Sequence, residues 1–215
     1  MSRLWSYVVV GALLALGAAR ARSQEVLDQI AARVEGDVIL LSEVRTLSRY
    51  QMLVDGKAES DAAILDRLID QWIVRNEAET ARFPHPTDAA IARGVEHLQA
   101  SFASPEDYQT RKKQSGLSDK EIRRMLAQQL YLSDYLDSRF RTAAQVNAKQ
   151  VEDFYEQAVV PRAKAHDQAP PSLDASREYI QEALVQRGIN EQAEVWLNES
   201  RSRLHVEKFL KESGK

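Results

Sequence analysis

The side chains that most often bind metals or form and break bonds are few and scattered in this sequence. Its histidines are His85, His97, His166 and His205, and no two of them have the i, i+4 spacing of a helical metal site. The chain has no cysteine, so it has neither a disulfide nor thiol chemistry. A zinc site would need carboxylate ligands that the sequence does not identify. We therefore expect no metal and no other cofactor.

Motifs of the common enzyme classes are also missing. The sequence contains no Gly-x-Ser-x-Gly nucleophile motif, no P-loop and no dinucleotide-binding fingerprint. Carboxylate pairs such as Glu77 and Glu79 are typical of a solvated helix face. The short basic run Arg111-Lys112-Lys113 is interpreted in the same way. The sequence predicts no catalytic residue and no enzyme.

The first 23 residues resemble a secretory signal peptide. Arg3 supplies the positive charge, and Val8 to Ala18 form the apolar stretch. Ala21-Arg22-Ser23 fits a small-x-small cleavage site, and Ala19-Arg20-Ala21 is a second candidate for it. The apolar stretch is too short to cross about 30 Å of hydrocarbon, so we favour cleavage over the alternative of an uncleaved anchor. We expect a mature chain that starts near Gln24, is not inserted in a membrane and lies in the bacterial periplasm.

Length and charge limit the remaining function classes. A chain of 215 residues predicts one large or two small domains. Its formal net charge is −3, and loss of the signal peptide would remove three arginines and no acidic residue. A chain this acidic is not expected to bind nucleic acid.

The chain is predicted to be organised around one amphipathic helix over Asp61 to Phe83. Two adjacent apolar positions recur every four residues, which is typical of a helix with a broad buried stripe. The stripe consists of Ile64, Leu65, Leu68, Ile69, Trp72 and Ile73. Pro84 and Pro86 end the helix, because proline lacks a backbone donor and disfavours helix in the residue before it. A stripe this wide needs packing partners on more than one side.

Other helices are predicted from their start signals, which are N-cap residues before an apolar periodic run. These N-caps are Ser42, Thr87, Ser104, Ser118 and Asn147. Two of the predicted apolar faces include a glutamine, Gln51 in the first helix and Gln129 in the helix after Ser118. Near the C-terminus, Asp174 to Arg187 is predicted as a helix interrupted at Gly188, and Asn190 is predicted to cap a final helix.

A small sheet is predicted from two distant segments. Val26 to Leu41 has the pattern of a β-hairpin with its turn at Glu35-Gly36-Asp37, where Gly36 would take a positive φ. One face of this hairpin should carry Ile30, Ala32, Val34, Val38 and Leu40. An isolated hairpin is marginal in water, and the strand predicted over Leu204 to Phe209 needs a sheet. We therefore expect the two segments to pair.

The sequence predicts that the mature chain consists of three parts. Residues 24–159 form the N-terminal helical region, residues 160–173 form a linker, and residues 174–215 return to the same core. The linker is predicted from its prolines Pro161, Pro170 and Pro171 and its low apolar content.

Several stretches, in their order along the chain, resemble the periplasmic SurA-type chaperones. Asp28–Val44 resembles the opening hairpin and first helix of that family, and Ile64–Ile73 resembles its long second helix. Asn190–Leu210 resembles its closing helix and strand. Together the matching parts cover most of residues 26–158 and again 174–210. The motifs are mainly structural, so the resemblance depends on their joint presence and order.

The chain departs from this family at the linker. In SurA-type chaperones, one or two parvulin-type prolyl isomerase domains stand between the N-terminal region and the returning C-terminal helix. Residues 160–173 are far too few for a domain, so the parvulin residues are absent. The resemblance therefore implies a mainly α fold, the helical chaperone core with a small antiparallel sheet, and no isomerase activity.

The function that the resemblance implies is that of an ATP-independent holdase for unfolded exported proteins, especially outer-membrane β-barrel precursors. A helical cradle with exposed apolar surface binds extended segments weakly and reversibly. Candidate contact residues are Phe102, Tyr108, Met125, Tyr131 and Tyr135. Aromatic and methionine side chains of this kind belong more often to an ordinary hydrophobic core than to a binding surface.

A second hypothesis is a dedicated periplasmic interaction or envelope-assembly subunit with one specific partner. A broad apolar crevice would favour the holdase, whereas a flat and narrow patch would favour the single partner. The sequence is compatible with a monomer or a dimer.

Overall fold

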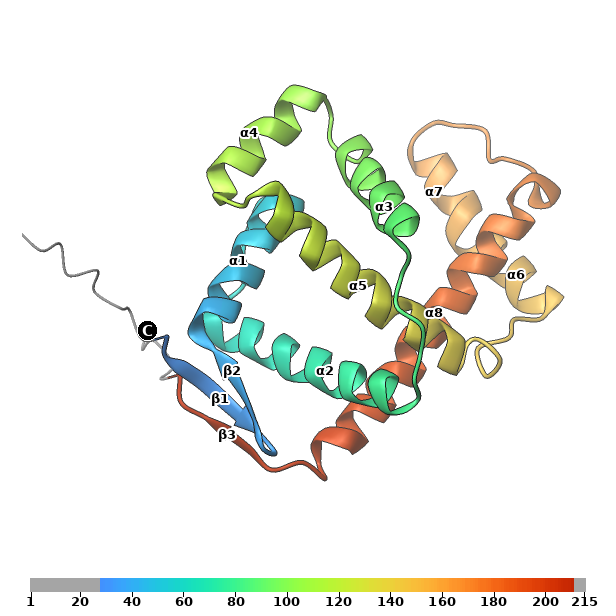
Figure 1. Ribbon diagram of the computed structural model, residues 1–215. Helices are drawn as coiled ribbons and strands as arrows, with labels where there is room; N and C mark the ends of the chain where they lie inside the picture. Colours follow the sequence, from blue (N-terminus) through green and yellow to red (C-terminus); the bar gives the residue numbers. More distant parts are fainter. Residues whose placement is uncertain (1–27, 211–215) are drawn as a thin grey trace, which may run out of the picture.

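The computed structural model describes residues 28–210, so the expected signal peptide, residues 1–23, lies outside the described part of the chain. Within residues 28–210 the chain is mainly helical and contains one small antiparallel sheet. Figure 1 shows this sheet at one corner of the molecule, with the helices extending away from it. The predicted fold class, mainly α with a sheet made by an N-terminal hairpin and a C-terminal strand, is confirmed.

The sheet joins the two ends of the described chain. Its strands are β1 (Ile30–Val34), β2 (Asp37–Leu40) and β3 (Val206–Lys208), in the order β2-β1-β3 with antiparallel pairing throughout. At the start of β3, the Glu35 N–H donates to the His205 carbonyl at 3.0 Å, and the Glu35 carboxylate accepts from the His205 N–H at 2.8 Å. The predicted pairing of the C-terminal strand with the hairpin is therefore confirmed, on the β1 side (Figure 1).

The predicted faces of the hairpin need one correction. The turn consists of two residues, because Val34 pairs with Asp37 and Ala32 with Ile39. Ile39 therefore points into the core, and Val38, predicted to face inward, is 47% exposed. A change of one residue in register exchanges the two faces of a strand, which explains the error. The positive φ of the turn, 53°, is also at Glu35 and not at Gly36.

Helix α1 (Leu41–Asp55) follows the hairpin without a loop. Its N-cap is Leu40, so the prediction of Ser42 as N-cap is wrong by two residues. The Glu43 carboxylate accepts from the Leu40 N–H at 2.8 Å and so replaces the missing N-cap side chain. The helix ends at Gly56, whose φ of 72° is a left-handed conformation that glycine adopts without strain.

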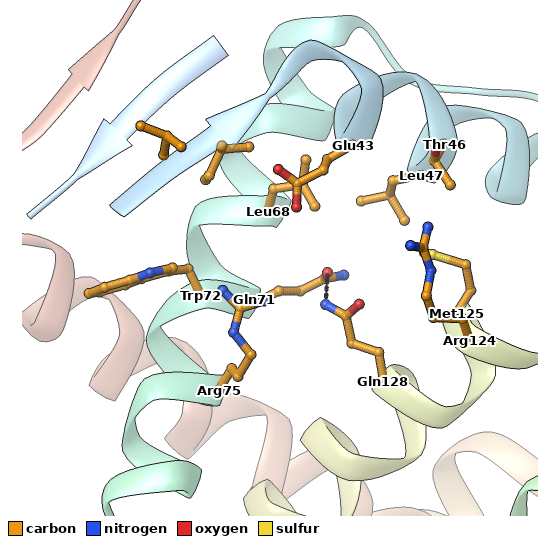
Figure 2. A pocket seen from close by; sticks show the side chains of 12 residues that line it. Glu43, Thr46, Leu47, Leu68, Gln71, Trp72, Arg75, Arg124, Met125 and Gln128 are labelled. Carbon is orange, nitrogen blue, oxygen red and sulfur yellow. Dashed lines mark hydrogen bonds between the residues drawn. The ribbon is translucent and has the colours of Figure 1, made fainter. Parts of the chain in front are cut away.

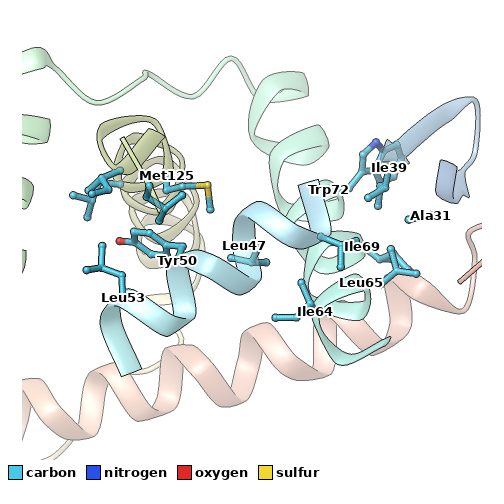
Figure 3. Close-up of a cluster of buried hydrophobic side chains, with 14 of the residues drawn as sticks. Ala31, Ile39, Leu47, Tyr50, Leu53, Ile64, Leu65, Ile69, Trp72 and Met125 are labelled. Carbon is cyan, nitrogen blue, oxygen red and sulfur yellow. The ribbon is translucent and has the colours of Figure 1, made fainter. Parts of the chain in front are cut away.

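Helix α2 (Asp61–Thr80) lies at the centre of the main hydrophobic cluster (Figure 3). Ile64, Leu65 and Ile69 are at most 3% exposed. Packing partners of α2 are α1, β1, α5 (Asp119–Phe140) and α8 (Leu173–Arg201). The expectation that its broad stripe needs neighbours on more than one side is thus confirmed.

The next helices begin where their caps predict. Helix α3 (Asp88–Ala100) has Thr87 as its N-cap, and α4 (Pro105–Ser115) has Ser104. Ser118 forms the predicted capping box with Glu121 at the start of α5. Figure 1 shows α3 and α4 on the side of α5 that faces away from α2.

The segment predicted as a linker is partly helical. Helix α6 (Ala148–Phe154) continues through a π-helical turn (Tyr155–Val159) into α7 (Val160–Ala165). The Val160 N–H bonds to the carbonyl of Tyr155, five residues earlier. A wider turn just before Pro161 relieves the clash of its ring with the preceding turn, so the proline does not end the helix. Only residues 166–172 are left as a loop.

Helix α8 is continuous, so neither the predicted interruption at Gly188 nor the predicted cap at Asn190 is present. A Cβ atom at position 188 would lie 3.0 Å from the Cβ of Ala144. Glycine is needed here for close packing and not for a turn. Beyond it, Trp196 and Leu197 pack against the same core as the N-terminal helices.

Candidate functional site

The five predicted contact residues do not form one surface. Phe102, Tyr108 and Met125 belong to the main hydrophobic cluster, and Tyr131 and Tyr135 belong to a second cluster with α2. All but Phe102, which is partly buried, are at most 9% exposed. Four of the five are therefore core residues in this structure, and their predicted contact with a client stays a prediction. Only Met125 also lines a cavity considered below.

A more suitable site lies between α1, α2 and α5. Two adjoining cavities open to solvent there, of about 260 Å³ on the side of the sheet and about 330 Å³ farther along α1. They share the wall residues Leu47, Gln71, Met125 and Gln128. We call the first the sheet-side cavity, the second the far cavity, and both together the α1–α2–α5 groove.

Each helix lines the groove with one face. Helix α1 contributes Glu43, Thr46, Leu47, Tyr50, Gln51, Val54 and Asp55. Helix α2 contributes Arg67, Leu68, Gln71, Trp72 and Arg75. Helix α5 contributes Arg124, Met125, Gln128 and Gln129, and β2 closes the end with Val38 and Ile39. These positions are three, four and seven apart on each helix, which is the spacing of one helix face.

The walls of the groove are partly apolar and remain partly open to solvent. Leu47 and Trp72 are each at most 7% exposed, since the core covers their other sides. The Trp72 indole is fixed by donating to the carboxylate of Asp37 at 2.8 Å. Val38 and Val54, which line the sheet-side and the far cavity, are 47% and 38% exposed. The groove thus offers apolar contact in both of its cavities.

Glutamine amides are spread along these walls. Gln128 donates to the side-chain carbonyl of Gln71 at 3.2 Å, across the boundary between the two cavities (Figure 2). Gln129 accepts from the Tyr50 hydroxyl at 3.3 Å, and Gln51 is bonded to Glu59 through both its amide oxygen and nitrogen. A side-chain amide can both donate and accept. Each of these glutamine amides therefore keeps hydrogen-bonding capacity that the bonds named above do not use.

Burial raises the pKa of Tyr50 to about 12. The Tyr50 hydroxyl therefore stays protonated and keeps donating to Gln129 at any physiological pH. The far cavity has an uncharged hydroxyl and amides on this wall, which suits an uncharged polar ligand such as a peptide backbone.

The charged residues of the groove differ in their partners. Arg67 makes a bidentate ion pair with Glu59, at 2.7 and 2.6 Å, and this lowers the pKa of Glu59. Arg75 and Arg124 both line the sheet-side cavity, and neither has an ion-pair partner within residues 28–210. Glu43 is the one carboxylate among the residues of that cavity.

The groove was not identified from the sequence, although a signal for it is present. Gln51 and Gln129 occupy positions on apolar helix faces, where an ordinary core would place an apolar side chain. That three such faces meet around one opening depends on helix packing. Among the side chains that line the groove, none is a nucleophile paired with a general base.

Residues 28–210 contain no group of three or more histidine, aspartate or glutamate side chains placed to hold a metal ion. No helix in this part of the chain is both long and apolar enough to span a membrane.

The sequence was also compared with known proteins. No protein-family model matches it, and no curated protein matches it.

Proposed function

We propose that the protein is an ATP-independent holdase of the bacterial periplasm, which binds unfolded exported polypeptides as extended segments in the α1–α2–α5 groove. Precursors of outer-membrane β-barrels are the proposed principal clients. The observation that carries this proposal is the combination of apolar walls and glutamine amides along one open groove.

This combination fits what an unfolded segment exposes. Such a segment presents apolar side chains and main-chain groups that have lost their secondary-structure partners. Amides such as Gln71 and Gln128 can bond to main-chain N–H and C=O groups of any sequence, since each amide is donor and acceptor. The apolar walls reward the burial of side chains without selecting one of them. Binding of many clients follows.

The expected affinity is weak enough for release without a nucleotide. Burial of one large apolar side chain stabilises a complex by about 1.5–3 kcal/mol. Ordering each flexible side chain costs about 0.5–1.5 kcal/mol, in addition to the cost of association itself. A few such contacts give a reversible complex, from which a client leaves when it folds or meets a stronger binder.

The resemblance of the chain to SurA-type chaperones supports the same proposal, as does the continuity of the two cavities along the groove. Helix α7 ends at Ala165 and α8 begins at Leu173, which leaves no room for an isomerase domain at this place. We therefore propose a holdase without prolyl isomerase activity. The purified protein should leave the slow cis/trans isomerisation of a proline peptide at its uncatalysed rate.

The proposal is tested with two matched variants of α1. Val54 and Met52 are similarly exposed, at 38% and 43%, but only Val54 lines the groove. Val54→Asp is expected to weaken the suppression of aggregation of an unfolded β-barrel client by several-fold, whereas Met52→Asp should act like the parent. Light scattering during dilution of the client from urea measures this, and circular dichroism verifies that both variants are folded.

Two outcomes would contradict the proposal. Equal losses in both variants would place the client elsewhere on the protein. No suppression by the parent at a few-fold excess would favour the alternative, a subunit with one specific envelope partner.

A further inference from the structure

The sheet-side cavity has a feature that general binding of apolar segments does not require. Arg75 from α2 and Arg124 from α5 both line it, and Figure 2 shows them on either side of the Gln71–Gln128 pair. Two cations contributed by different helices to one cavity need an explanation, since like charges repel and gain nothing from each other.

Within residues 28–210, no carboxylate forms an ion pair with either of these two arginines. Glu121, one turn before Arg124, is held by the Ser118 capping box and pairs with Arg49 at 3.4 Å. Glu77, near Arg75 in α2, instead faces Arg139 at 3.9 Å. Within the described chain, neither Arg75 nor Arg124 lies within 4.0 Å of a carboxylate oxygen.

The carboxylate that lines the cavity is already in use. Glu43 accepts the Leu40 N–H at 2.8 Å, as the cap of α1. With Glu43 fully charged, the cavity is still lined by two cations and only one anion, in a chain whose net charge is −3. The local excess of positive charge is thus opposite in sign to the protein as a whole.

The apolar side chains of the cavity strengthen the attraction of its excess positive charge for an anion. Leu47 and Met125, at most 9% exposed, and the indole of Trp72 keep water from part of the cavity, and charges attract more strongly where water is excluded. A guanidinium presents a planar fork of donors that matches a carboxylate. An unfolded polypeptide carries no other anionic group than carboxylates.

We propose that the sheet-side cavity is a carboxylate-binding subsite, in which Arg75 and Arg124 hold one carboxylate of the segment bound along the groove. That carboxylate is the C-terminal group of the segment or an aspartate or glutamate side chain within it. The inference rests on the proposed function, because the apolar part of the segment is taken to lie in the rest of the groove. The subsite makes the groove select segments by their charge. It also fixes the direction of a segment whose C-terminus lies in the sheet-side cavity.

The test uses three fluorescein-labelled peptides of one aromatic-rich sequence. The first is neutral with an amidated C-terminus, the second has a free C-terminal carboxylate, and the third is amidated with one internal glutamine replaced by glutamate. Fluorescence anisotropy with the full chain gives the Kd of each. One or both carboxylate peptides should bind about tenfold more tightly than the neutral peptide at low salt, and the difference should shrink at high salt. The carboxylate peptide that binds more tightly than the neutral one shows whether the subsite takes a C-terminal or a side-chain carboxylate.

The variants then assign the effect to the cavity. Arg75→Gln combined with Arg124→Gln should remove the preference, so that the three peptides bind this variant with equal Kd. Arg93→Gln is the matched control, because Arg93 is exposed on α3 and does not line the groove. Glu43→Gln, which keeps an oxygen as acceptor for the Leu40 N–H, should increase the preference.

The contrary results separate failure of the subsite from failure of the proposed function. Equal Kd values of the three peptides for the parent would overturn the subsite and leave the holdase proposal standing. The same holds if the preference survives in the double variant. If none of the peptides binds the parent, the proposed function fails, and the subsite fails with it.

Discussion

At the scale of single residues, a surface cluster on α5 and α8 shows how the C-terminal helix is attached. Arg141 donates to the Glu182 carboxylate through Nη1 at 3.0 Å and Nη2 at 2.8 Å, and to the Asp137 carboxylate through Nε at 2.8 Å and Nη2 at 2.6 Å. These hydrogen bonds from Arg141, followed by one from Gln186, lower the pKa of Glu182 to about 2 from its ordinary value of 4.5. Arg141 and Glu182 are exposed and Asp137 is partly exposed, so each bond contributes little by itself.

The cluster predicts a particular dependence of stability on pH. A carboxyl whose pKa is lower in the folded state stabilises the fold above its unfolded pKa, and this contribution is lost as the pH falls through the folded value. Glu182→Gln should therefore lower the melting temperature at pH 7, and the difference from the parent should narrow between pH 4.5 and about 2. Calorimetry across this range measures it. A difference that is constant with pH would contradict the assignment to the Glu182 charge.

At the scale of elements, two glycines in helices have opposite surroundings. Gly188 in α8 faces Ala144, whose Cβ and Cα would lie 3.0 and 3.4 Å from an added Cβ. Gly94 in α3 faces only the flexible end of Leu130 at 3.4 Å. Close helix packing therefore requires glycine at position 188 but not at position 94.

This contrast gives a pair of predictions with opposite sign. Gly94→Ala should raise the free energy of unfolding by up to about 1 kcal/mol, because alanine favours the helix. Gly188→Ala has the same gain but overpacks against Ala144, at a cost of about 1–3 kcal/mol, so it should lower stability. Urea unfolding measures both, and Ala144→Gly should partly rescue Gly188→Ala. Equal stabilisation by the two alanine substitutions would show that α8 can move away without cost.

At the scale of the whole molecule, the C-terminal segment closes the fold onto its N-terminal part. Arg201 makes a bidentate ion pair with Asp70 of α2, and Lys208 reaches Asp66 one turn earlier at 2.5 Å. Burial raises the pKa of Asp70, although the hydrogen bonds from Arg201 oppose this shift. Together with β3, these pairs hold the last described residues against the helix at the centre of the core.

Removal of residues 203–215 should therefore destabilise the entire fold. It deletes β3 and the Lys208–Asp66 pair and leaves β1 with an unpaired edge, which favours association between chains. We expect a lower urea midpoint and concentration-dependent aggregation, measured by circular dichroism and light scattering. Removal of residues 211–215 alone, which keeps β3, is the control. An unchanged midpoint for the longer deletion would show that the two ends fold independently.

The sequence by itself determined most helices, because their signals are local, and also the pairing of the hairpin with the C-terminal strand, because neither is stable without a partner. Ser104 and Ser118 cap their helices through bonds to residues three positions away. The apolar stripe of α2 likewise depends only on 3.6-residue periodicity. The prediction failed at Ser42 because Glu43 caps the helix at Leu40 instead. It failed at Gly188 because this glycine packs closely against Ala144 and does not form a turn.

The groove was decided by the tertiary structure alone. Tyr131 and Tyr135 have the composition of a binding surface, yet packing against α2 buries them. Gln71 and Gln128 are ordinary helix residues in the sequence, yet packing brings them within 3.2 Å of each other in an open groove. The exposure of a helix face depends on what packs over it. At Gln71 and Gln128 this packing brings together residues that are 57 positions apart in the chain. The fold class follows from local patterns, whereas the candidate site follows from which faces are left uncovered.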